Sequence, residues 1–208
     1  MASVTVRGTA TGAATPDEAT VVVELAGLRP TADEAYAHVA ERSAALAAVL
    51  DGIGVDRRRR SAGGVSVGEE VEFVDGRQQH RGFRATVRTS LRLEDPAVVA
   101  RVLRDAVAEA GARVEGPNWL VRPDNPAHLE AARAAAAAAR GKAEAYAEAL
   151  GVRLGVLERV AEPGLGPPEP KLFTRALAAD AAPAEIGVEP GELLVFASVE
   201  LTYALEPA

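Results

Sequence analysis

The sequence predicts an α+β fold, with antiparallel or mixed sheets and three helices packed on one side. Several segments alternate apolar and polar residues with the period of two that a half-buried strand requires. Three longer segments place apolar residues three and four positions apart, which is typical of amphipathic helices. The predicted order is ββαββαβαββ, and paired strands with helices between the pairs favour an α+β architecture over a parallel sheet.

The first two strands are predicted on either side of a turn at residues 15–17. Val4 and Val6 alternate with polar neighbours before the turn, and Val21 and Val23 continue the same period after it. We expect these two strands to pair with each other as an opening β-hairpin.

A capping box predicts where the first helix begins. Thr31 stands three residues before Glu34, so each side chain can bond the other residue's backbone N–H. Gly52 is the predicted C-terminal stop, because glycine adopts a left-handed conformation at little cost. The expected buried face contains Tyr36, Val39, Ser43, Leu46 and Leu50.

A long hairpin is predicted after the first helix. Residues 59–74 form an irregular strand region with apolar positions at Val65, Val67, Val71 and Phe73. Asp75-Gly76 predicts a tight type I′ turn, because both central positions of that turn need positive φ. The return strand has one polar and one apolar face. Its apolar face consists of Phe83, Ala85, Val87, Thr89, Leu91 and Leu93.

Two further helices open with the same signal, an N-capping residue followed by proline. Asp95-Pro96 begins the second helix, which Gly111 ends, and Asn125-Pro126 begins the third. An alanine-rich seam on the third helix permits close packing, since its ridges are shallow. The expected seam is Leu129, Ala132, Ala136, Ala139, Ala143, Tyr146 and Leu150.

A proline-rich segment, residues 163–191, precedes the last strand at residues 194–205. Loops of this length are uncommon in compact domains, so we expect a functional excursion or a flexible loop before the last strand. The chain as a whole predicts one domain over residues 1–208, with lobes at 1–94 and 95–208 as a finer division.

Composition and charge restrict the class of protein. The chain contains no cysteine, which excludes disulfides, thiolate metal sites and cysteine nucleophiles. Its formal net charge of -7 argues against bulk electrostatic binding of nucleic acid. No apolar run approaches the roughly 18 residues of a membrane span. The N-terminus lacks a basic segment followed by an apolar stretch, so we expect a soluble cytoplasmic protein; removal of a leader would make a periplasmic or cell-envelope location the alternative.

A search for catalytic or ligand-binding chemistry yields no constellation of residues. His38, His80 and His128 lie in different predicted elements, and none stands at a metal-ligand spacing. The sequence has no phosphate-binding loop, dinucleotide fingerprint or nucleophile elbow. The run Arg57 to Arg60 is flanked by acidic residues, so we interpret it as a solvated loop and strand start. We therefore predict no catalytic residue, no cofactor, no metal site and no nucleic-acid partner.

The candidates for a subunit interface are Arg84, Arg88, Arg92 and Trp119. The three arginines form a basic stripe on one face of a predicted strand, and arginine is enriched at interfaces. The leading interpretation of the stripe is nevertheless a solvent-facing sheet surface that pairs with Glu70 and Glu72 across the hairpin, and the subunit interface is the alternative. The tryptophan is interpreted as a core residue or, alternatively, as an interface anchor.

Five segments carry a resemblance to a known family. They are Val4-x-Val6-x-Gly8, Leu50-Asp51-Gly52-Ile53-Gly54, Gly82-Phe83-Arg84-Ala85, Ala149-Leu150-Gly151-Val152-x-Leu154-Gly155 and Val199-x-Leu201-x-Tyr203-x-Leu205. Their order and spacing resemble the SIMPL-domain family, which includes the bacterial YggE-like proteins, over essentially the whole chain. The resemblance implies an α+β fold, a tendency to self-assemble, links to stress response and signalling, and no established catalytic site.

The leading hypothesis is a non-enzymatic, self-assembling structural or interaction protein that forms a homo-oligomer. The empty chemical inventory, the alanine seam, the arginine stripe and the proline-rich loop motivate it. The alternative is a small-ligand binding or sensor protein with a cleft beneath the 163–191 loop. An enzyme with an unrecognised site built from arginine, aspartate and glutamate is a third hypothesis.

Overall fold

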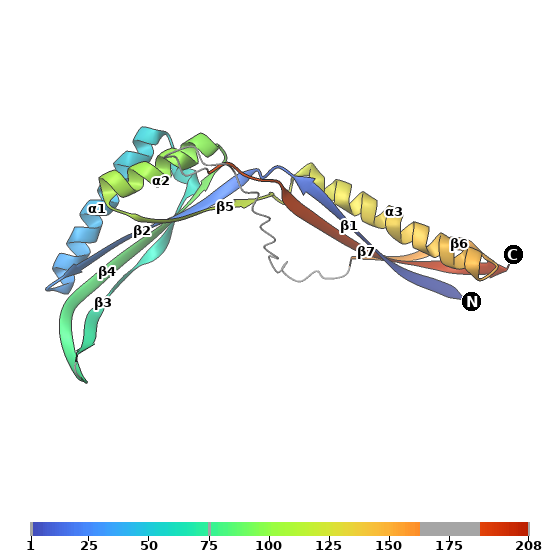
Figure 1. Ribbon diagram of the computed structural model, residues 1–208, viewed down its shortest axis with the longest axis horizontal. Helices are drawn as coiled ribbons and strands as arrows, with labels where there is room; N and C mark the ends of the chain where they lie inside the picture. The colour runs from blue at the N-terminus through green and yellow to red at the C-terminus, as the bar shows by residue number, and fades with distance from the viewer. Residues whose placement is uncertain (1, 75, 163–187, 208) are drawn as a thin grey trace, which may run out of the picture. The chain divides into compact units, whose positions relative to one another are not determined.

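The computed structural model describes residues 2–74, 76–162 and 188–207. Within these ranges the chain forms three α-helices and seven strands in two antiparallel sheets (Figure 1). This confirms the α+β class and the order ββαββαβαββ. The segment predicted as a flexible loop, 163–191, lies mainly outside the described residues.

The elements are β1 (Ser3–Ala14), β2 (Glu18–Arg29), α1 (Ala32–Ile53), a 3-10 turn (Arg57–Arg59), β3 (Arg60–Val74), β4 (Arg77–Leu93), α2 (Pro96–Ala110), β5 (Arg113–Leu120), α3 (Pro126–Ala149), β6 (Val152–Ala161) and β7 (Leu193–Pro207).

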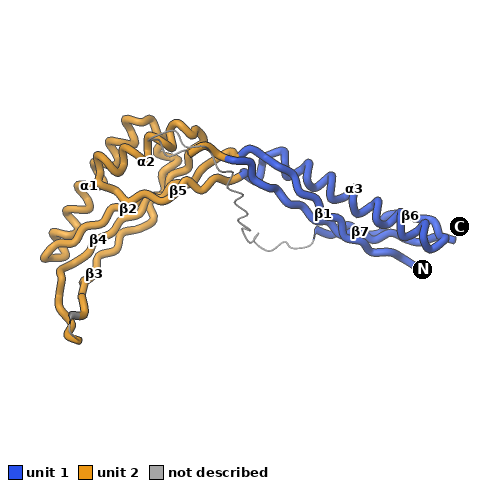
Figure 2. Tube along the Cα trace, viewed as in Figure 1, with its two compact units in different colours: residues 1–15, 121–183, 191–208 blue, residues 16–120, 184–190 orange. Residues whose placement is uncertain are grey.

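The chain divides into two compact units, which Figure 2 distinguishes by colour. Among the described residues, the first unit comprises 2–15, 121–162 and 191–207, and the second comprises 16–74, 76–120 and 188–190. The predicted lobes, 1–94 and 95–208, each contribute segments to both units. That residues 1–208 form a single domain stays a prediction.

The second unit is a four-stranded antiparallel sheet with α1 and α2 on one face (Figure 1). The strand order is β3-β4-β2-β5, so β3 and β5 are the edges. Alternate residues of β2 point at the helices and are completely buried: Ala19, Val21, Val23 and Leu25. Because all four of these side chains lie on the helix side, the hydrophobic core of this unit occupies one face of the sheet. No other element described in the same unit covers the opposite face.

The first unit is a three-stranded antiparallel sheet of order β1-β7-β6, and α3 packs on one of its faces. Val6, Leu201 and Tyr203 are buried beneath the helix. The residues that alternate with them face the other way, where Thr5 and Thr202 share a side-chain hydrogen bond of 3.0 Å across the two strands. This unit is therefore also a helix on one side of a sheet.

The buried seam of α3 differs from the predicted one. Leu129, Tyr146 and Leu150, which were expected in the seam, are exposed. The reason is the closeness of β1, where Gly8 lies directly against the helix backbone and leaves no room for a larger side chain. The buried positions follow one another at a spacing of four and are all alanine: Ala131, Ala135, Ala139, Ala143 and Ala147.

The predicted opening hairpin is wrong. β1 pairs with β7, at the other end of the chain, and β2 pairs with β4 and β5. Strand alternation shows which residues lie on one face, but it does not identify the neighbouring strand. The predicted hairpin between β3 and β4 is present, with Val74 opposite Arg77 and Gly76 at a φ of 75°. Asp75, the other predicted turn residue, lies outside the described residues.

Helix boundaries follow the predicted capping signals with one exception. Thr31 and Glu34 form the capping box of α1. That helix continues past Gly52 and ends at Gly54, whose N–H bonds the carbonyls of the last turn at a φ of 90°. The N-caps of α2 and α3 are the predicted Asp95 and Asn125.

In the described ranges, no helix combines the length and the apolarity that crossing a membrane requires.

Candidate interaction surface on the four-stranded sheet

Strand β4 places the predicted arginine stripe on the side of its sheet that points away from α1 and α2. Its alternation buries Ala85 and Leu91 on the helix side, so the residues between them point the opposite way. Arg84, Arg88 and Arg92 are all exposed. We call this side of the four-stranded sheet the open face.

Arg84 forms a two-point ion pair with Glu70 of β3. Its Nε donates to Oε2 at 2.6 Å and its Nη2 donates to Oε1 at 2.8 Å. These hydrogen bonds lower the pKa of Glu70, and Glu70 in turn raises the pKa of Arg84. Both side chains remain more than a third exposed, so the pair fixes their geometry more than it stabilises the fold.

The remaining arginines of the stripe behave differently from each other. Arg88 turns to the strand on its other side, where its Nε donates to Oε2 of Glu24 at 2.6 Å. This hydrogen bond raises the pKa of Arg88. The partner expected from the sequence, Glu72, instead pairs with Arg81 at 2.9 Å. Arg92 makes no ion pair with any residue that the structure describes, so its charge is the one in the stripe that a partner could use.

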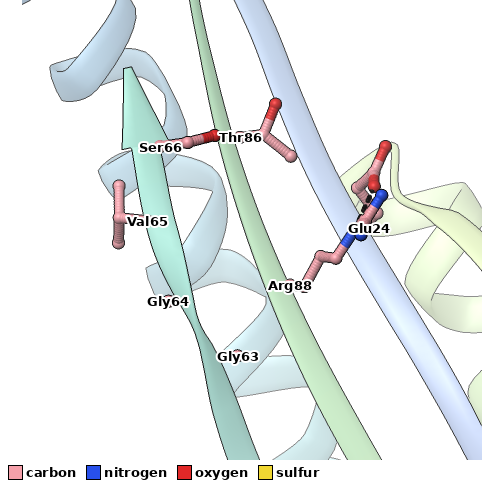
Figure 3. Close-up of a pocket in the computed structure, with 7 residues that line it drawn as sticks. All are labelled: Glu24, Gly63, Gly64, Val65, Ser66, Thr86 and Arg88. Atoms are coloured by element: carbon pink, nitrogen blue, oxygen red, sulfur yellow. Dashed lines mark hydrogen bonds and ion pairs between the residues drawn. The ribbon is translucent and has the colours of Figure 1, made fainter.

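A shallow groove of about 390 Å³ opens beside the ion pair between Arg88 and Glu24 (Figure 3). It lies where β3 carries an extra residue relative to β4, and Gly64 there has a φ of 98°. Figure 3 shows the ion pair on the near side of the sheet, with a helix behind it. The groove presents hydroxyl and backbone groups to a ligand, and the two charged side chains beside it, Arg88 and Glu24, are already paired with each other. Its lining is Glu24, Gly63, Gly64, Val65, Ser66, Thr86 and Arg88.

Trp119 lies on β5 and is half-buried against the core of the second unit. Its backbone pairs with Ala19 of β2, and its indole Nε1 donates to the carbonyl of Val188 at 3.2 Å. The apolar ring and its polar N–H therefore both have partners within the same unit. These contacts favour the core interpretation, and an interface role for Trp119 stays a prediction.

The arginine run at residues 57–60 is bound to carboxylates of its own unit. Arg60 donates to Asp51 at 2.6 Å and Arg59 donates to Glu94 at 2.8 Å. The hydrogen bond from Arg60, and a second one from the same run, lower the pKa of Asp51. The run therefore fastens the 3-10 turn and the start of β3 to α1 and to the end of β4, which agrees with its interpretation as a loop and strand start.

The three histidines lie in three different elements, α1, β4 and α3. Nδ1 of His38 is 2.8 Å from Nη2 of Arg29, and partial burial followed by the nearby arginines lowers the pKa of His38. Nδ1 of His80 is 2.7 Å from Oε1 of Glu69. Within the part of the chain that the structure describes, no group of three or more histidine, aspartate or glutamate side chains is placed to hold a metal ion.

Arg42 on α1 is a residue that sequence reasoning missed. Its Nε donates to the carbonyl of Ala110 at 2.9 Å, its Nη1 donates to that of Ala26 at 2.7 Å, and its Nη2 donates to that of Gly111. One guanidinium thus joins α1 to the end of α2 and to β2. No local signal could have identified it, because all three partners are backbone atoms that are distant in the sequence or on another element.

The edge strand β3 carries a second feature that the alternation did not predict. Its apolar residues belong to a strand with a period of two, which is typical of a half-buried strand. The end of the hairpin formed by β3 and β4 extends beyond α1 and α2 (Figure 1), and the apolar residues at odd positions of β3 are at least a third exposed. We call the exposed residues the β3 row: Val65, Val67, Val71 and Phe73.

Together these features define a class of protein: an α+β chain whose four-stranded sheet presents a charge-paired open face and an exposed apolar edge strand. The chain belongs to the SIMPL family, described as "Protein of unknown function (DUF541)", whose pattern matches residues 4–203. This match confirms the resemblance found in the sequence and extends over nearly the whole chain. No curated protein matches the chain.

The chain is similar in part to a solved structure. It is the crystal structure of a hydantoinase/carbamoylase family amidase from Burkholderia ambifaria, with 21% sequence identity and a TM-score of 0.23. The similarity covers 49% of this chain and 27% of that chain, so the protein spans about a quarter of the amidase's length. At this TM-score the likeness carries no argument about fold or activity.

Proposed function

We propose that this chain is a non-enzymatic protein that assembles with copies of itself, using the open face and the β3 edge as contact surfaces. The pairing of charges on the open face carries the proposal. Arg84 and Arg88 already have carboxylate partners within the sheet. A second protein surface can therefore cover the open face without leaving either charge buried and unpaired, which would be strongly destabilising.

The same pairing argues against an anionic partner such as nucleic acid. Binding phosphates requires cations that can exchange counterions for phosphate oxygens. In the stripe, Arg84 and Arg88 are held by Glu70 and Glu24, and only Arg92 lacks a described carboxylate partner. One available cation in the stripe suits an interface contact better than it suits a phosphate-binding track.

The pKa shifts on the open face favour binding over proton transfer. A general acid or base works best with a pKa close to the operating pH. Here the pKa of Glu70 is lowered and the pKa of Arg84 is raised, so both groups stay charged across the neutral range. A pair of this kind orients a surface and does not donate or accept protons in a reaction.

The predicted interface residues take different parts in this proposal. Arg92 is the leading contact, since it is exposed and has no described carboxylate partner. Arg84 and Arg88 contribute a fixed pattern of alternating charge. Trp119 lies at the margin because its contacts are internal. Links to stress response and signalling stay expectations that rest on the family resemblance, and the cellular location also stays an expectation.

Solution mass measured by light scattering after size exclusion tests the assembly. The measurement covers a range of protein concentration and salt, because contacts through Arg92 weaken as ionic strength rises. We expect a defined multimer whose mass grows with concentration to a limit. A strict monomer at every concentration would contradict the proposal.

The second candidate function is small-ligand binding. The predicted cleft beneath residues 163–191 lies outside the described residues, and the observation in favour is the groove beside Arg88, whose volume falls within the range of ligand sites. A thermal-shift screen of polar metabolites would test it. A compound present at one hundred times its Kd would add about 2.7 kcal/mol to the free energy of unfolding. Stabilisation that disappears with Ser66→Val would place the ligand in the groove.

A further inference from the structure

β3 is an edge strand with unusually little protection against pairing. The other edge of its sheet, β5, is short and contains Pro117, which cannot donate a hydrogen bond to a neighbouring strand. β3 spans 15 residues without proline. From Val65 onward it is also regular, because the register shift in that part comes from an extra residue on β4, Arg81. Its outer backbone groups therefore present an uninterrupted template for another strand.

The β3 row gives this edge an apolar side. Val65, Val67, Val71 and Phe73 are 57%, 42%, 36% and 73% exposed. They occupy odd positions, so all four point to the same side of the strand. Large apolar side chains that line an exposed edge mark a site of pairing with another chain.

The charges along the same stretch already have partners on β4. Glu69 contacts His80 at 2.7 Å, and Glu70 and Glu72 pair with Arg84 and Arg81. A basic peptide would have to compete with Arg84 for Glu70 and with Arg81 for Glu72. This stretch of β3 thus combines the exposed β3 row with two carboxylates that are already ion-paired, and it suits a partner strand with the same properties.

The sequence of β3 is itself such a partner, because its apolar residues are arranged symmetrically about Glu69. We propose that two copies of this chain join by antiparallel pairing of β3 with β3, with the two-fold axis at Glu69. Val65 then faces Phe73 of the second copy, and Val67 faces Val71. This proposal deepens the proposed function and rests on it, since it names the contact through which copies assemble.

The other side of the strand fits the same register. Residues directly opposite in an antiparallel pair lie on the same face, so a two-fold axis must pass through a residue position. With the axis at Glu69, Glu70 faces Gly68 and Glu72 faces Ser66. An axis at Gly68 places Val67 against Glu69, and an axis at Glu70 places Val71 against Glu69. Among these three registers, only the axis at Glu69 sets every member of the β3 row against another member.

This register has one unfavourable contact, and that contact makes it testable. Glu69 faces Glu69 of the second copy, and like charges directly opposite each other weaken strand pairing. Glu69→Gln should therefore tighten the dimer about twofold to fivefold. Val67→Lys should weaken it about tenfold, since the change acts twice in each dimer. Val156→Lys, on an exposed valine of β6 in the other unit, is the matched control and should leave the association unchanged.

The absence of cysteine allows a direct test of the register. In a Glu69→Cys variant the two Cα atoms would lie about 4.5–5.5 Å apart, within the range that a disulfide spans. In Glu72→Cys, a change of the same residue type on the same strand, the two positions would be six residues apart, about 20 Å. We expect mild oxidation of the full chain to give a covalent dimer from the first variant and not from the second, as read by non-reducing electrophoresis.

The outcomes separate this inference from the proposed function. A monomeric parent chain would contradict both. A multimer that Val67→Lys does not weaken, or equal cross-linking at positions 69 and 72, would overturn the β3 pairing and leave self-assembly through another surface standing. Circular dichroism of each variant checks folding, and the cysteine pair decides the register even if Val67→Lys is misfolded.

Discussion

Gly8 of β1 lies so close to Ala139 of α3 that a Cβ atom at position 8 would stand 2.7 Å from the Cβ atom of Ala139 and 2.5 Å from its backbone nitrogen. Non-bonded carbon atoms in protein interiors are most favourably about 3.5–4.0 Å apart. The strand and the helix therefore meet with no side chain between them on the strand side and only methyl groups on the helix side. This contact sets the spacing of the first unit.

Gly8→Ala should destabilise the first unit. The added methyl group has no room, so the helix or the strand must shift, and overpacking of this kind costs about 1–3 kcal/mol. Urea unfolding followed by circular dichroism measures the change in the free energy of unfolding. Gly12→Ala on the same strand is the control, because a Cβ atom there meets nothing within 4 Å. Equal effects at the two positions would contradict the close approach.

Arg42→Met should destabilise the second unit. The change keeps the length and apolar stem of the side chain but leaves three backbone carbonyls without their charged donor. Hydrogen bonds to charged groups contribute about 1.5–3 kcal/mol each and are not additive, so we expect a loss of at least about 2 kcal/mol. Arg101→Met, on the exposed surface of α2, should change the stability by less than about 0.5 kcal/mol. Denaturant unfolding of both variants makes the comparison.

The pairing of Asp51 with arginine predicts a loss of stability in acid. Its pKa is lowered in the folded protein, so its contribution is present above the ordinary aspartate pKa of about 4 and is lost as the pH falls through the lower folded value. Asp51→Asn should therefore reduce the slope of stability against pH below about pH 4. Thermal unfolding over a pH series measures this slope.

Two arginine substitutions should separate the contributions of Arg60 and Arg57 to the lowered pKa of Asp51. Arg60 is the larger cause of the lowered pKa, and Arg57 is the smaller one. The Arg60 side chain is 12% exposed and that of Arg57 is 83% exposed, so solvent screens the second pair more strongly. Arg60→Gln should consequently flatten the acid slope more than Arg57→Gln does. The reverse order would contradict the assignment.

Arg92→Glu should weaken the association between copies of the chain and leave the stability of the fold unchanged. Arg92 makes no ion pair with a described residue, so its replacement should leave the free energy of unfolding of the monomer within about 0.5 kcal/mol. On the assembly surface the reversed charge should weaken association and change its dependence on salt. Sedimentation velocity at several salt concentrations measures both changes. Unaltered association would remove Arg92 from the interface.

Local chemistry in the sequence determined the elements and several of their boundaries. The capping box of Thr31 and Glu34 and the caps Asp95 and Asn125 are confirmed, because each signal operates within three residues. Alternation along β4 correctly assigned its buried face for the same reason. The α+β class and the family membership followed from the order of these signals along the chain.

Only the tertiary structure decided which elements meet. β1 and β2 are separated by three residues, yet they belong to different sheets. The backbone N–H and C=O groups of a strand need hydrogen-bond partners, and a strand distant in the sequence can supply them as well as a neighbouring one. The sequence did not show which face of α3 is buried, because alanine occurs all round the helix. The close approach of Gly8 determines the buried face. The exposure of the β3 row depends on the position of β3 at the edge of its sheet. Each of these outcomes depends on contacts between residues far apart in the sequence, and the pattern of neighbouring residues does not encode such contacts.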